Sequence, residues 1–94
     1  MRVLVVEDHG ETRGMIEAVL REAVYAAVPA GTLAEARGFL QAGGLAAIVL
    51  DWMLPDGSGP DLCAEMRASG DATPILMLTA RSGVEDRVVG LDAG

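Results

Sequence analysis

Residues 45–51 read LAAIVLD, an unbroken apolar run that ends on the carboxylate of Asp51. Such a run without polar alternation predicts a β-strand buried on both faces, as in a parallel sheet covered by helices. Similar runs at residues 3–6 (VLVV) and 75–78 (ILML) predict two more central strands. Residues 25–28 are a weaker candidate for a further strand. Because helical stretches separate these strands, the chain is expected to be an α/β domain with a parallel sheet.

Helix signals fill the stretches between the strands. Residues 11–23 place Ile16, Val19, Leu20 and Ala23 on one helical face, as expected of a helix that lies on a sheet. A hydroxyl residue followed three positions later by a carboxylate predicts the starts of three further helices, over residues 33–42, 59–68 and 83–93. The capping pairs are Thr32 with Glu35, Ser58 with Asp61, and Ser82 with Glu85.

The composition limits the classes of protein to which the chain can belong. Its 94 residues suffice for one domain, with a formal net charge of -7. All 7 basic residues are Arg, so no strongly basic surface is available and we expect no direct nucleic-acid binding. The run at residues 3–6 is too short for a signal peptide or a membrane span, which predicts a cytoplasmic protein without a membrane partner. The single cysteine, Cys63, favours a reducing compartment and is expected to be a buried, inert thiol.

Polar side chains follow each of the three central strands. Glu7 and Asp8 come directly after the first strand, Asp51 ends the second, and Thr79 follows the third. Because the carboxyl ends of parallel strands meet at one edge of a sheet, we expect these groups to converge. Like charges at close range favour a bound cation, and carboxylate oxygens are ligands that Mg²⁺ prefers. A carboxylate nucleophile, a Mg²⁺ site and a hydroxyl donor together suit phosphoryl transfer.

Three segments carry a family resemblance: VLVVEDHGETR (3–13), AAIVLDWMLPDGSG (46–59) and PILMLTARSGVEDRVVGLDAG (74–94). Together they resemble the receiver domain of two-component response regulators, in particular the subclass joined to winged-helix transcription factors. The resemblance covers residues 1–94 and implies a flavodoxin-like sheet of strand order 2-1-3-4. It implies that Asp51 accepts a phosphoryl group from a sensor histidine kinase. It also implies that Glu7, Asp8, Asp51 and the backbone carbonyl of Met53 hold Mg²⁺, and that Thr79 is the switch hydroxyl.

The chain departs from the family pattern after residue 94. The family has a fifth strand, which carries a Lys, and a fifth helix, and no Lys stands anywhere in this chain. The sequence is therefore expected to be a fragment, a truncated product or a degenerate receiver. A missing strand and helix would leave the strand at residues 75–78 as an open edge and one sheet face uncovered. We therefore expect self-association.

Two other functions remain open. A vestigial receiver could act as a docking module for a kinase or another receiver without being phosphorylated. A small Mg²⁺-dependent phosphatase could use Asp51 as its nucleophile, but Met53 stands where a general acid would be expected two residues on. If the chain is a phosphorylated receiver, we expect it to be a phosphoacceptor rather than an enzyme with an external substrate. His9 is interpreted as an exposed loop residue.

Overall fold

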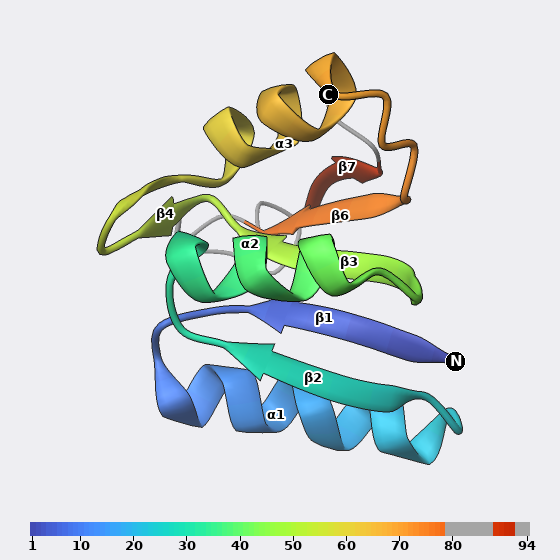
Figure 1. Cartoon of the computed structure of the whole chain (residues 1–94). Coiled ribbons are helices and arrows are strands. Elements are labelled where there is room, and N and C mark those ends of the chain that lie inside the picture. The colour runs from blue at the N-terminus through green and yellow to red at the C-terminus, as the bar shows by residue number, and fades with distance from the viewer. Residues whose placement is uncertain (79–87, 92–94) are drawn as a thin grey trace.

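A central sheet of five strands organises the chain (Figure 1). The structure, a computed structural model, describes residues 1–78 and, for the backbone, residues 88–91. The strands are β1 (Arg2–Val6), β2 (Ala26–Ala30), β3 (Leu45–Asp51), β6 (Ile75–Leu78) and β7 (Val88–Leu91). Their order is β2-β1-β3-β6-β7, and the first four are parallel to one another, whereas β7 is antiparallel to β6. The predicted order 2-1-3-4 counted the four parallel strands along the chain, so its fourth strand is β6, and this order is confirmed.

Helices cover both faces of this sheet. The helix α1 (Gly10–Glu22) lies on one face, and α2 (Leu33–Ala42) and α3 (Gly59–Ala68) pack on the other. Two predicted caps are present: the Thr32 hydroxyl accepts a hydrogen bond from the Glu35 amide at 3.1 Å, and the Ser58 hydroxyl accepts one from the Asp61 amide at 3.2 Å. These side chains satisfy amides that would otherwise lack partners at the helix starts.

The main core lies between the sheet and the pair α2 and α3. Leu4 and Val6 of β1 point into it from the sheet, and Leu33 of α2 and Leu62 of α3 meet them. Cys63 is 1% exposed and belongs to the same core, so its predicted burial is confirmed. Burying such large side chains supplies most of the favourable free energy of folding.

The opposite face is covered less completely. Of the predicted apolar stripe on α1, Ile16 and Leu20 are partly buried, but Val19 is 65% exposed and Ala23 is also exposed. The prediction of this stripe is therefore only partly confirmed, because α1 packs beside β1 and β2 and, among the described residues, the rest of this face is left open. A groove of about 330 Å³ remains there, lined by Met1, Val3, Leu20, Tyr25, Val49 and Leu76, among other residues.

The prediction of a fourth helix over residues 83–93 is wrong for the residues of this range that the structure describes. Residues 88–91 instead form β7, which pairs antiparallel with β6 and covers the edge that was expected to be open. Strand edges expose unpaired amides and carbonyls, and a run that begins with two β-branched valines suits pairing with such an edge. The proposed cap Ser82 and the rest of that helix lie outside the described residues.

Within the described helices, none has the length and apolar character needed to span a membrane.

A short hairpin follows β3 and was not predicted. It consists of β4 (Met53–Leu54) and β5 (Gly57–Ser58), paired antiparallel. Its strands are too short to show a periodic pattern in the sequence. The hairpin carries the chain from the end of β3 to the first turn of α3, so it borders the edge of the sheet at which the acids gather.

Candidate functional site

Two acidic side chains meet at the carboxyl edge of the sheet. In the parallel pairing of β1 with β3, Val6 is the register partner of Leu50, so the next residues, Glu7 and Asp51, emerge side by side. Both are 5% exposed. The Glu7 amide donates a hydrogen bond to the carbonyl of Ala30 at 2.9 Å, which continues the β1–β2 ladder up to the site. The structure thus brings these two predicted residues together.

Burial and the neighbouring acids raise the pKa of Asp51 to about 7. The largest cause is the loss of water around the carboxyl group, followed by its hydrogen bond with Glu7, the charge of Glu7 and a smaller effect of Asp8. The amide of Trp52 opposes this shift by donating to Asp51 Oδ1 at 2.9 Å. A carboxyl group with this pKa is only partly ionised near neutral pH, and a cation beside it would favour its ionised form.

Asp8 and His9 lie at the mouth of the same site. The Asp8 side chain is 31% exposed, and ligand atoms of Glu7, Asp8 and His9 all lie within 4.8 Å of one another. His9 is 74% exposed, as expected of a loop residue, but its Nδ1 lies 3.1 Å from Glu7 Oε1 and 3.4 Å from Asp8 Oδ1. The sequence interpretation missed these contacts, although adjacency in the chain was a signal for them.

Of the two remaining predicted site residues, Met53 and Thr79, only Met53 lies among the described residues. Met53 is the first residue of β4, two positions after Asp51, and the residue is 58% exposed. Thr79 lies outside the described residues. The group whose ligand atoms converge is Glu7, Asp8 and His9, with Asp51 beside Glu7, and carboxylate oxygens of this kind suit a hard divalent cation such as Mg²⁺. The pKa of Asp51 is raised first by burial and then by its hydrogen bond with Glu7 and the charges of Glu7 and Asp8, and a cation would neutralise that charge.

Backbone contacts hold the two loops that carry these acids. Arg13 of α1 donates from Nη1 to the carbonyl of Glu7 at 2.8 Å and so fixes the turn after β1. The Gly59 amide donates to the carbonyl of Trp52 at 2.7 Å. A Cβ at Gly59 would collide with the carbonyl oxygen of Asp51, so the start of α3 approaches β3 closely only because this residue is glycine. Neither Arg13 nor Gly59 was predicted from the sequence to support the site.

The strand order and the acids at the ends of β1 and β3 define a flavodoxin-like α/β domain with an acidic site at the carboxyl edge of its sheet. Residues 3–94 match the family described as the response regulator receiver domain. The chain therefore belongs to this family of receivers of two-component systems.

Relatives with curated names support the same assignment. The chain is 40% identical over 94 residues to the response regulator MprA of Mycobacterium avium (strain 104), and this match covers 100% of the chain and 41% of the relative. The chain thus spans about two fifths of the length of this relative.

Solved structures share the fold. The receiver domain of the Francisella response regulator 1452 has a TM-score of 0.81 at 27% identity, over 89% of this chain and 69% of that one. The response regulator TrrA of Thermotoga maritima, in complex with Mg(2+)-BeF, has a TM-score of 0.80 at 31% identity, over 86% of this chain and 70% of that one.

Proposed function

We propose that the chain accepts a phosphoryl group on Asp51 from a sensor histidine kinase, with Mg²⁺ bound by Glu7, Asp8, Asp51 and the carbonyl of Met53. The observation that carries this proposal is the buried carboxyl of Asp51, paired with Glu7 and raised in pKa, in a chain of the receiver family. The Mg²⁺-bound TrrA relative supports the choice of metal. Receiver domains are in general phosphoacceptors without an external turnover substrate, and the same is proposed here.

In the proposed reaction, a carboxylate oxygen of Asp51 attacks the phosphorus of the phosphohistidine. The new O–P bond forms as the N–P bond breaks, and the electron pair of that bond leaves with the imidazole nitrogen, which takes a proton from water. The Trp52 amide orients the attacking group through its bond to Asp51 Oδ1. Mg²⁺, when bound, neutralises charge on the transferring phosphoryl group. Glu7 and Asp8 hold the cation against Asp51, and Thr79 stays a prediction for the switch hydroxyl.

These 94 residues contain no Lys, and for a chain of this extent that favours one alternative, a receiver that docks on a partner without being phosphorylated. A fixed positive charge at a phosphoryl-transfer site contributes orders of magnitude in rate. In a chain of these 94 residues alone, transfer to Asp51 is therefore expected to be slow compared with receivers that have the Lys. Under either function the expected partner is a sensor histidine kinase or another receiver.

Metal binding is tested by titrating Mg²⁺ into the chain and following the emission of Trp52, the only Trp, which adjoins Asp51. The emission should change over millimolar Mg²⁺, and Asp8→Asn should abolish the change because it removes a charged ligand. An unchanged emission, confirmed by calorimetry that detects no heat of binding, would contradict the metal site.

Phosphorylation is tested by intact mass after incubation with acetyl phosphate and Mg²⁺. A slow gain of one phosphoryl group that is lost in Asp51→Ala would support the proposed phosphoacceptor. No gain, together with retained Mg²⁺ binding, would favour the docking module. A rapid and complete gain would show that fast transfer to Asp51 does not require the Lys.

A further inference from the structure

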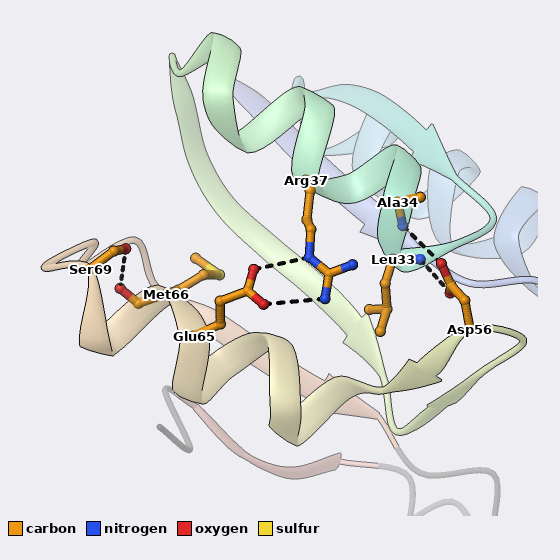
Figure 2. A network of polar contacts seen from close by, with 7 residues as sticks. All are labelled: Leu33, Ala34, Arg37, Asp56, Glu65, Met66 and Ser69. Atoms are coloured by element: carbon orange, nitrogen blue, oxygen red, sulfur yellow. Dashed lines mark hydrogen bonds and ion pairs between the residues drawn. The ribbon is translucent and has the colours of Figure 1, made fainter.

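The hairpin after Asp51 is held at its tip by a helix that comes earlier in the chain. Asp56 lies in the turn between β4 and β5 and its carboxylate points at the first turn of α2 (Figure 2). Oδ1 accepts a hydrogen bond from the Leu33 amide at 2.8 Å, and Oδ2 accepts one from the Ala34 amide at 3.0 Å. The two oxygens of the Asp56 carboxylate thus accept hydrogen bonds from neighbouring amides at the start of α2.

This contact is charge-assisted. The amides at a helix start carry a partial positive charge, and a carboxylate is the side chain that they bind best. The pKa of Asp56 is lowered, first by the bond from Leu33, with further contributions from Ala34 and from the charge of Arg37. The clamp is therefore made by the ionised form of Asp56, which is the form present at neutral pH.

Close packing reinforces the clamp. Gly57 has φ of +152°, and a Cβ there would lie 2.7 Å from Leu33 Cδ1. Leu33 is 1% exposed, so it cannot move aside without opening the core. The hairpin is therefore pressed against the same residue of α2 whose amide Asp56 binds.

The other end of the hairpin is fixed at the acidic site. The Gly59 amide bonds the carbonyl of Trp52, and Met53 is the register partner of Ser58, the residue that caps α3. The proposed metal ligand, the carbonyl of Met53, lies between this anchor and the clamped tip. An ion pair continues the connection from α2 to α3, since Arg37 Nε lies 3.0 Å from Glu65 Oε2 and its Nη2 lies 3.2 Å from Glu65 Oε1 (Figure 2).

We propose that Asp56 is a positioning residue for the phosphoacceptor site: by clamping the hairpin to α2, it holds the carbonyl of Met53 where the metal needs it. The inference rests on the proposed function, because it assigns Asp56 a role toward that metal. Asp56 does not touch the metal in this proposal. Groups that orient metal ligands typically alter metal affinity about 10- to 100-fold when they are removed. We expect the lower end here, since one carbonyl is only one ligand of several.

The experiment compares three variants of the chain by calorimetric titration with Mg²⁺ and by the rate of labelling with acetyl phosphate. Asp56→Ala removes both clamp bonds. Asp56→Asn keeps one acceptor oxygen and should retain part of the effect. Thr32→Ala is the matched control, because at the same end of α2 it removes the bond from the Glu35 amide rather than a bond to Asp56. Urea denaturation shows how much stability each variant has lost.

Asp56→Ala is expected to bind Mg²⁺ about tenfold more weakly and to be labelled more slowly, with Asp56→Asn intermediate. Thr32→Ala should lose stability but keep the affinity of the wild type within about twofold, since its loss is confined to the helix. If Asp56→Ala does not fold, the Mg²⁺ affinity of Asp56→Asn is compared with that of Thr32→Ala instead.

Two failures can be told apart. If the wild type shows no Mg²⁺ binding that depends on Asp8, the proposed function is wrong and this inference falls with it. If the wild type binds Mg²⁺ but the Asp56 variants bind it as well as Thr32→Ala does, the metal site stands and only the positioning role is overturned.

Discussion

Replacing Asp51 by Asn should stabilise the metal-free protein at neutral and alkaline pH. The wild-type carboxyl is 5% exposed beside Glu7, and its pKa is raised from 3.8 to about 7. Asn has nearly the same shape and carries no charge. Its carbonyl oxygen can still accept from the Trp52 amide, and its amide group can donate to Glu7. The variant therefore keeps the local hydrogen bonds and removes the cost of burying a second negative charge.

The sign and size of this effect follow from proton linkage. Between pH 3.8 and about 7 the folded protein holds a proton on Asp51 that the unfolded chain has lost, so the free energy of unfolding of the wild type falls as pH rises through this window. One pKa unit corresponds to about 1.4 kcal/mol. The cost to the wild type is about 2 kcal/mol at pH 5 and about 4 kcal/mol at pH 8, where it levels off. Below the window the two proteins should be equally stable.

The measurement is urea denaturation followed by far-UV circular dichroism at pH 5 and pH 8, with a chelator present so that no metal binds. The advantage of Asp51→Asn should grow by about 2 to 3 kcal/mol between the two pH values. Asp61→Asn is the control, because Asp61 is an exposed acid in the first turn of α3 and its loss should cost less than about 1 kcal/mol. An advantage of Asp51→Asn that did not change with pH, or a less stable variant at pH 8, would refute the reasoning.

Two further predictions concern the packing of α3 and the open face of the sheet. Gly59→Ala should cost about 2 kcal/mol in urea denaturation, because its Cβ would collide with the carbonyl oxygen of Asp51. Gly38→Ala in α2 should instead gain up to about 1 kcal/mol, since nothing lies within 4 Å of the added Cβ; equal effects of the two changes would contradict this account. Light scattering should show species larger than 9.7 kDa that dissociate on Tyr25→Glu, because this change puts a charge into the apolar groove beside α1. A monodisperse wild-type monomer would contradict the expected self-association.

Much of the fold could be predicted because its signals are local. The strands β1, β3 and β6 each contain an unbroken apolar run, and such runs have few alternatives to a strand buried on both faces. The starts of α2 and α3 follow from the hydroxyl groups of Thr32 and Ser58, whose partners lie three residues away. The meeting of Glu7 with Asp51 was also predictable, since parallel strands bring their carboxyl ends to one edge.

Contacts between distant segments could not be predicted in this way. The partners of Asp56 are backbone amides 22 and 23 residues earlier, and every residue except proline offers such an amide, so no side-chain pattern marks them. Residues 88–91 carry a capping signal upstream, but in the structure they pair with β6, because an open strand edge is a property of the assembled sheet. The raised pKa of Asp51 likewise depends on burial, which arises only when β1, β3 and α3 are packed together. Local patterns specify elements, whereas desolvation, edge pairing and long-range clamps exist only after those elements have met.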